Sequence, residues 1–216
     1  MYSCVLFDMD GTLVDSYPGI YQAYRYAFEK MGLPFGGEAF VSRAIGAPLP
    51  HVFTRLCGLS PEKATQAIGH YRQYYAQQGK HQAVPYPGVE RMLRRLRSAG
   101  RYLATATLKK EEFAREMLAE QGLLPYFYAV FGADAQGYRS KADLIRLGCA
   151  AAGASPGETV LVGDSVFDAE GAQAAGVAFL AVTYGYGFSS VEEAVQHPHV
   201  TMAIKTPEEA VERLLG

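Results

Sequence analysis

The sequence predicts an α/β protein whose core is a Rossmann-like parallel sheet with helices on both faces, interrupted by an inserted all-helical cap domain. Two observations favour the core: short β-rich runs alternate with longer helical stretches, and most runs are apolar on consecutive residues, as in strands covered on both faces. This alternation predicts parallel strands joined by right-handed crossovers. A third observation, an interval without a convincing strand, predicts the insert.

The expected core elements follow one another in a regular order. The β-rich runs, each bounded by Gly, Asp or Thr, span residues 3–7, 102–106, 129–131, 159–162 and 179–182. The helical stretches between them close on Gly or enter from Pro or Asp, and they span residues 87–100, 110–122, 141–153 and 166–176.

The insert is expected over residues 16–85, which leaves residues 1–15 and 86–216 as the Rossmann-like core. Helical patterns within it fall at residues 17–32, 50–58 and 60–79. The segment VPYPG, residues 84–88, is typical of a stiff linker that returns the chain to the core.

Composition excludes several classes of partner. The 216 residues include 20 Lys and Arg against 22 Asp and Glu, a net charge of −2, which is unlike a generic nucleic-acid or anionic-lipid surface. No window is long and apolar enough for a membrane span, and Asp8 comes too early for a signal peptide. Cys4, Cys57 and Cys149 are expected to be buried free thiols. We therefore expect a cytoplasmic monomer or homodimer without nucleic-acid or membrane partners.

Polar residues follow several of the predicted strands, where open α/β sheets bind ligands. Those that share this edge, together with the first residue of a following helix, are Asp8, Asp10, Thr107, Lys141, Asp164 and Asp168. Four carboxylates in one crevice would repel one another unless a cation lay among them. Mg²⁺ prefers oxygen ligands and commonly binds carboxylates together with a substrate phosphate. The cluster therefore indicates a small phosphorylated metabolite as substrate.

The remaining groups at this edge are suited to phosphate. Lys141 and Thr107 would hold the non-bridging oxygens, and backbone N–H groups at Gly11 and Thr12 would add neutral donors. Lys109 and Lys110 compete with Lys141 for the phosphate role. Gly11 has no Cβ to obstruct a close approach.

The spacing Asp8-x-Asp10 favours a two-step reaction. Alternate residues at a strand end share a side, so one carboxylate can face phosphorus while the other lies near the leaving oxygen. Asp8 would attack phosphorus to form an aspartyl-phosphate, and Asp10 would protonate the departing alkoxide and later deprotonate water.

The segments FDMDGTLVDS (residues 7–16) and VGDSVFD (residues 162–168) resemble the haloacid dehalogenase superfamily of phosphohydrolases. The resemblance covers the whole chain. It implies that Asp8 is the nucleophile, Asp10 the acid/base and a metal ligand through its carbonyl, and Asp164 a side-chain metal ligand with Asp168 beside it. Thr107 and Lys141 match the second and third motifs, and the insert is similar to the family's helical cap.

The segments FGADAQGYRSKADLI and TYGYG resemble the phosphoglycolate-phosphatase-like and nucleotidase-like branch. Leu108 departs from the pattern, because many relatives have Ser or Asn there, so its backbone N–H must replace a side-chain contact with phosphate. Dehalogenases lack an acid at the position of Asp10, which disfavours dehalogenation.

Three functions therefore remain open from the sequence. The expected one is a Mg²⁺-dependent phosphatase for phosphoglycolate, a nucleotide or a sugar phosphate. A phosphomutase would share its chemistry. A phospho-accepting receiver module would also use Asp, Thr, Lys and Mg²⁺, but receivers lack a helical insert and carry the acceptor Asp on a later strand.

Overall fold

The computed structural model describes residues 2–134 and 139–216. Residues 135–138, within the segment FGADAQGYRSKADLI, lie outside the described residues. The chain divides into a core unit, Met1–Asp15 with Pro85–Gly216, and a helical unit, Ser16–Val84. Short strands at the two crossings between the units, β2 (Val14–Asp15) and β3 (Val84–Pro85), pair with each other.

The core unit contains a six-stranded sheet in the order β5-β4-β1-β6-β7-β8, with every neighbouring pair parallel. Its strands are β1 (Cys4–Phe7), β4 (Tyr102–Lys110), β5 (Ala129–Ala133), β6 (Thr159–Gly163), β7 (Ala178–Val182) and β8 (Met202–Ile204). The five expected runs are all strands, which confirms the predicted parallel α/β core. The sequence pattern missed β8, because three residues are too few to show a period.

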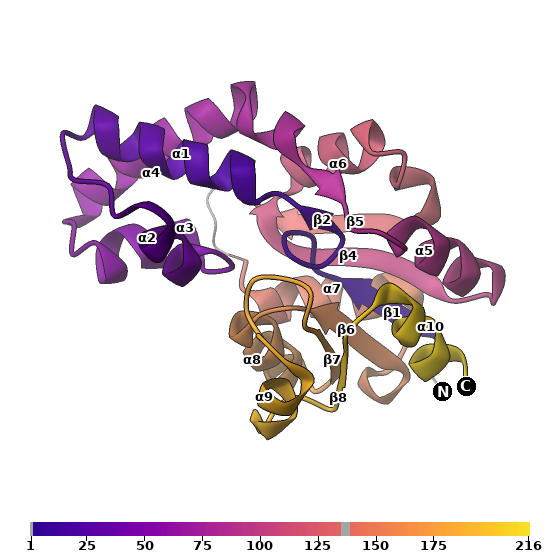
Figure 1. The fold of residues 1–216 in the computed structure, drawn as a ribbon. Coiled ribbons are helices and arrows are strands. Elements are labelled where there is room, and N and C mark those ends of the chain that lie inside the picture. Colours follow the sequence, from indigo (N-terminus) through magenta and orange to yellow (C-terminus); the bar gives the residue numbers. More distant parts are fainter. Residues whose placement is uncertain (1, 135–138) are drawn as a thin grey trace. The chain divides into compact units, whose positions relative to one another are not determined.

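Helices cover both faces of this sheet (Figure 1). The expected helices are α5 (Val89–Ser98), α6 (Glu111–Glu120), α7 (Lys141–Ala152) and α8 (Val166–Ala175), and the sequence pattern missed α9 (Val191–Gln196) and α10 (Pro207–Leu215). Short helical turns lie at Leu124–Tyr126 and Pro156–Glu158. Helices α7 and α8 contact each other, and α10 contacts α5. Right-handed crossovers place the α7–α8 pair and the α5–α6 pair on opposite faces.

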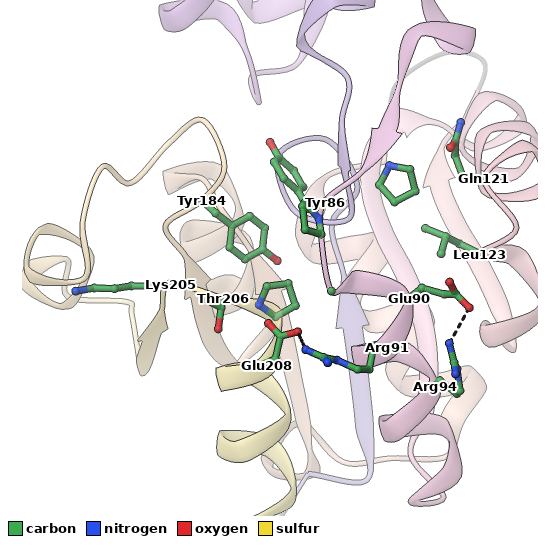
Figure 2. Close-up of a pocket in the computed structure, with 14 residues that line it drawn as sticks. Tyr86, Glu90, Arg91, Arg94, Gln121, Leu123, Tyr184, Lys205, Thr206 and Glu208 are labelled. Carbon is green, nitrogen blue, oxygen red and sulfur yellow. Dashed lines mark hydrogen bonds and ion pairs between the residues drawn. The ribbon is translucent and has the colours of Figure 1, made fainter.

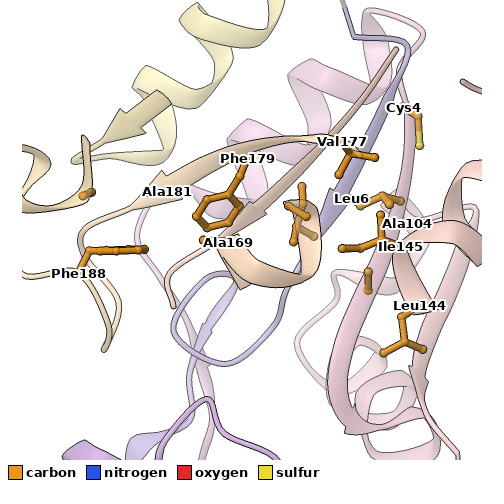
Figure 3. Packing of buried hydrophobic residues seen from close by; sticks show 14 residues of the cluster. Cys4, Leu6, Ala104, Leu144, Ile145, Ala169, Val177, Phe179, Ala181 and Phe188 are labelled. Atoms are coloured by element: carbon orange, nitrogen blue, oxygen red, sulfur yellow. The ribbon is translucent and has the colours of Figure 1, made fainter. Parts of the chain in front are cut away.

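The core face under α7 and α8 is built from alternate residues of the strands (Figure 3). Cys4 and Leu6 of β1 are fully buried there, in one cluster with Ile145 of α7 and Phe179 of β7. A Cβ at Gly148 of α7 would lie 2.6 Å from a Leu6 methyl carbon, so glycine at this position lets the helix approach the strand. The packing of α7 thereby fixes the position of its first residue, Lys141.

The helical unit has an aromatic core. Its elements are α1 (Tyr17–Lys30), α2 (Gly37–Ala44), α3 (Leu49–His51), a π-helical segment (Val52–Leu56), α4 (Pro61–Gln77) and a 3₁₀ turn (Gly79–Gln82). Tyr24 of α1 lies centrally, with its ring centroid 5.3 Å from that of Phe40 and 4.7 Å from that of Tyr71. Helix α2, where no helix was expected, contributes Phe40 to this cluster.

Two further expectations concern the thiols and the membrane. Cys4, Cys57 and Cys149 are unpaired, but only Cys4 is fully buried, whereas the other two are half-buried. Cys57 and Cys149 therefore differ from the expected burial. Within residues 2–134 and 139–216, no helix has the length and hydropathy that a membrane span requires.

We predict that Leu6→Ala lowers the free energy of unfolding of the core unit by about 3 kcal/mol, because it leaves a cavity under α7 that the fully buried neighbours cannot fill. Leu147→Ala on α7 is the control. Leu147 is 38% exposed, so this substitution should lower the free energy of unfolding by less than about 1 kcal/mol. Urea unfolding followed by circular dichroism measures both. Equal losses would contradict the packing described here.

Candidate active site

The site lies at the carboxyl edge of the core sheet, around the end of β1. This strand lies between β4 and β6, with Phe7 opposite Thr105 on one side and Val162 on the other. Asp8 follows Phe7, and its N–H extends the ladder by donating to the Val162 carbonyl at 2.9 Å. The order of strands reverses at β1, and open α/β sheets bind ligands at such positions.

Lys141 is a buried cation of the site, with only 6% of its surface exposed. Its Nζ lies 2.7 Å from Asp8 Oδ1 and 2.6 Å from Asp168 Oδ1, and it donates to the Ala106 carbonyl at 2.9 Å. Burial lowers the pKa of Lys141, but Asp168 and Asp8 outweigh this effect, so the net shift is upward. The ammonium group is therefore charged at physiological pH.

Two local features hold Lys141 in this position. Helix α7 begins at Lys141, and a reciprocal capping box between Ser140 and Asp143 fixes its first turn. Gly171 of α8 faces the lysine stem, since a Cβ there would lie only 2.3 Å from Lys141 Cγ. A glycine on α8 therefore makes room for the side chain.

Three buried carboxylates, those of Asp8, Asp164 and Asp168, form one cluster, with one oxygen of each within 4.8 Å of the others. Burial raises the pKa of Asp8 to about 6; Lys141 opposes the shift, and Asp168 and Asp10 add to it. Burial, with Asp168 and Asp8, also raises the pKa of Asp164 well above its usual value. One ammonium does not balance three carboxylates. This all-oxygen, electronegative donor set fits a hard divalent cation such as Mg²⁺.

Asp164 is oriented by the loop that follows β7. Its Oδ2 accepts hydrogen bonds from the N–H groups of Tyr186, at 2.8 Å, and Gly187, at 3.3 Å. Its Oδ1 accepts from the Thr12 hydroxyl at 3.2 Å. The sequence-predicted phosphate residue Thr12 is thus fully buried and contacts the candidate metal ligand.

Two tyrosine hydroxyls hydrogen-bond this loop to the segment after β1. Tyr184 Oη donates to the Thr12 carbonyl at 3.0 Å, and Tyr186 Oη donates to Asp15 Oδ1 at 2.8 Å. A Cβ at Gly185 would lie 2.2 Å from the Gly11 carbonyl oxygen, so only glycine permits this approach. Sequence reasoning gave the TYGYG segment no structural role. The available signal was its alternation of glycine and tyrosine directly after a strand.

Both the backbone conformation and the space at position 11 require glycine. The φ of Gly11 is +81°, in the left-handed region that favours glycine, and a Cβ there would lie 2.4 Å from Asp164 Oδ2. The close approach expected from the sequence is therefore made by a protein carboxylate. Backbone contact of Gly11 with a phosphate stays a prediction.

Thr107 and Leu108 lie at the end of β4 and differ in direction. Thr107 is buried, and its Oγ1 accepts a hydrogen bond from the Lys109 N–H at 3.2 Å. The Leu108 side chain packs against the hydrophobic cluster under α7 and α8. Its side chain is therefore committed to the core, so the expected phosphate contact of Leu108 would have to come from its backbone.

The structure separates the lysines that compete in the sequence. Lys141 reaches Asp8, Lys109 Nζ lies 3.0 Å from Asp10 Oδ2, and Lys110 forms a surface pair with Glu112. Asp10 therefore lies at the same edge as Asp8, but its carboxylate pairs with a different cation.

Both oxygens of Asp168 have protein partners. Oδ1 contacts Lys141, while Oδ2 accepts from the Ser165 N–H at 3.0 Å and the Ser165 hydroxyl at 2.7 Å. This arrangement forms a capping box at the start of α8. In the structure, Asp168 contacts Lys141 and caps the start of α8. Metal binding through Asp168 stays a prediction.

A pocket of about 770 Å³ lies elsewhere on the core unit, between the starts of α5 and α10 (Figure 2). None of the sequence-predicted site residues lines it. The rings of Tyr86 and Tyr184 meet at a tilt along its wall with centroids 5.0 Å apart, and four of its charged residues form the pairs Arg91 with Glu208 and Arg94 with Glu90. Tyr184 therefore links this pocket to the loop that holds Asp164.

We predict that Gly185→Ala weakens Mg²⁺ binding about 10-fold or more, because the loop must move and withdraw its N–H donors from Asp164. Calorimetric titration with MgCl₂ measures the affinity. Gly157→Ala is the control, since nothing lies within 4 Å of a Cβ at that position. Unchanged Mg²⁺ affinity in Gly185→Ala would contradict the orienting role of the loop.

Comparisons with known proteins agree with this geometry. Tyrosine-protein kinase PtkA of Mycobacterium tuberculosis is 37% identical over 184 residues, which are 85% of this chain and 62% of that protein. The chain thus spans less than two thirds of PtkA. A 5'-nucleotidase of Pseudomonas aeruginosa is 32% identical over 91% of this chain and 88% of its own length.

Solved structures extend the similarity to the whole chain. A crystal structure of a predicted phosphatase from Clostridium acetobutylicum superposes with a TM-score of 0.93 at 30% identity, covering 100% of this chain and 99% of that one. The family model for haloacid dehalogenase-like hydrolases matches residues 5–182, from β1 to the end of β7. The chain therefore belongs to the haloacid dehalogenase-like hydrolase family.

Proposed function

We propose that this protein is a Mg²⁺-dependent phosphatase that hydrolyses a small phosphomonoester through an aspartyl-phosphate on Asp8. The observation that carries the proposal is the buried contact of 2.7 Å between Lys141 Nζ and Asp8 Oδ1 inside a cluster of carboxylates. Relatives named 5'-nucleotidase and phosphoglycolate phosphatase support this class of activity.

In the proposed first step, an Asp8 carboxylate oxygen forms a bond to phosphorus while the bond between phosphorus and the ester oxygen breaks. The ester oxygen takes the electron pair and receives the proton of the Asp10 carboxyl group. In the second step, Asp10 accepts a proton from water as the water oxygen attacks phosphorus, and the bond to Asp8 breaks. The net reaction converts ester and water to alcohol and phosphate, and Asp10 regains its proton.

Asp8 and Asp164 would hold Mg²⁺ with their side chains and Asp10 with its carbonyl, beside Asp168. When bound, the ion supplies positive charge to the phosphate oxygens. Lys141 adds a fixed ammonium group at Asp8 Oδ1, where it orients the attacking carboxylate. Thr107 would donate a hydrogen bond to phosphate.

The helical unit is proposed as the cap that selects the leaving group, so its residues would decide between phosphoglycolate, a nucleotide and a sugar phosphate. The division of the chain into a core unit and a helical unit, with boundaries near residues 16 and 85, supports this role for the helical unit.

Unpaired thiols are typical of reducing compartments, which supports a cytoplasmic location. We propose a monomer or homodimer.

Transfer of the phosphoryl group to a hydroxyl other than water is the second candidate. It includes a phosphomutase, and the similarity to a protein named a tyrosine-protein kinase favours testing protein hydroxyls as well. Three assays distinguish these reactions: phosphate release, isomerisation of a sugar phosphate, and transfer of label from ATP. A receiver module is disfavoured by the nucleophile directly after β1, the first strand, and by the inserted helical unit.

We predict that Asp8→Asn lowers kcat for phosphate release from p-nitrophenyl phosphate by more than about 1000-fold, because it removes the proposed nucleophile. Glu170→Gln, which neutralises an exposed carboxylate on α8, is the matched control and should retain activity. A phosphate-release assay with MgCl₂ measures both. Turnover by Asp8→Asn at the wild-type rate would remove Asp8 from the mechanism.

We predict that Mg²⁺ raises the thermal midpoint more at about pH 7.5 than at about pH 5. Because burial raises the pKa of Asp8 from 3.8 to about 6, its contribution to stability is present at low pH and is lost as the pH rises through 6. Bound Mg²⁺ then stabilises the ionised Asp8. Mg²⁺ at about 100 times its Kd raises the free energy of unfolding by about 2.7 kcal/mol. Thermal unfolding with MgCl₂ or EDTA measures this effect, and an equal midpoint shift at both pH values would contradict it.

A further inference from the structure

Lys109 is a buried lysine that the proposed reaction has not yet used. Only 6% of its side chain is exposed, and its Nζ lies 3.0 Å from Asp10 Oδ2. Lysine is rarely buried unless it is paired. The next residue, Lys110, behaves in the ordinary way, since its side chain is 31% exposed and pairs with Glu112.

The end of β4 fixes the direction of Lys109. Lys109 reaches the site edge, where its Nζ contacts Asp10 Oδ2. Its N–H donates to Thr107 Oγ1, and the pairing of β4 with β5 shifts register between Thr107 and Lys110. A Cβ at Gly132 would lie 2.7 Å from the Lys109 carbonyl oxygen, which shows how closely β5 packs on this backbone.

The site therefore pairs two carboxylates with two different lysines. Lys141 contacts Asp8, and Lys109 contacts Asp10. The Asp10 carboxylate is near enough to Asp8 to raise its pKa, so the two acids repel each other. A cation on the far acid offsets this repulsion and limits the rotation of the Asp10 side chain.

We propose that Lys109 is a positioning residue whose Nζ holds the Asp10 carboxyl group in the orientation from which it protonates the leaving oxygen. The inference rests on the proposed phosphatase function. The proton moves from Asp10 to the ester oxygen as its bond to phosphorus breaks, and Lys109 neither gains nor loses a proton. Esters with poor leaving groups depend most on this proton, so they should depend most on Lys109.

The test compares leaving groups in matched variants. Lys109→Met removes the positive charge and retains an unbranched side chain, whereas Lys109→Arg keeps the positive charge. Lys110→Met is the control. Substrates are p-nitrophenyl phosphate, whose leaving group needs little protonation, and three primary alkyl esters: 2-phosphoglycolate, AMP and glucose 6-phosphate. The value of kcat/KM covers the steps up to departure of the leaving group.

We expect Lys109→Met to lower kcat/KM about 100-fold for any alkyl ester that the wild type hydrolyses, and less than about 5-fold for p-nitrophenyl phosphate. Lys109→Arg should recover most of the loss, and Lys110→Met should match the wild type. Equal losses on both classes of ester, or no loss, would overturn the proposal. If Lys109→Met does not fold, Lys109→Gln replaces it in the same comparison.

A double-mutant cycle gives an independent measurement. If Lys109 acts through Asp10, Lys109→Met should cause no further loss in an Asp10→Asn background, whereas additive losses would refute the assignment. Failure of the proposed function would look different, because the wild type itself would then release no phosphate from any of these esters, and the inference on Lys109 would fall with it.

Discussion

The burial of like charges at the end of β1 and β6 is the constraint on which the rest of the core unit depends. Asp8, Asp164 and Asp168 are all removed from water, and a single ammonium group lies between two of them. Buried charges are tolerated only when they are paired and hydrogen-bonded. The fold meets this requirement with Lys141, with N–H donors from two loops and with carboxylate oxygens close enough to one another to hold a cation. A core built only for stability would gain nothing from this arrangement.

Glycine is the means by which helices and loops come close enough to those charges. Gly171 admits the Lys141 stem, Gly11 admits the Asp164 carboxylate, and Gly185 lets the loop after β7 reach the Gly11 carbonyl. Only Gly11 of these three has a positive φ, so the requirement at Gly171 and Gly185 is for space and not for backbone freedom. The same residue type therefore serves two physical purposes around one site.

The sequence predicts those features that repeat or that follow a fixed rule. Apolar runs predict five of the six strands, and the carboxyl-edge rule brings Asp8, Asp164 and Lys141 together. The sequence does not predict β8, which is too short to show a hydrophobic period, or the loop whose backbone orients Asp164. The order of the motifs favours Lys141 over Lys109 and Lys110 for the phosphate role, but the sequence does not predict which acid each lysine contacts, because their directions depend on the register shift at the end of β4 and on the packing of α7.

The separation of the two lysines gives the two neighbouring acids different environments. Asp8 is buried beside an almost enclosed ammonium group, so little water can compete for its carboxylate, and such a position suits an atom that must attack phosphorus. Asp10 is more exposed and pairs with Lys109, and an acid that exchanges protons with a leaving group and then with water needs that access. Two residues apart in the chain, the acids can therefore take different roles because different strands and helices supply their counter-charges.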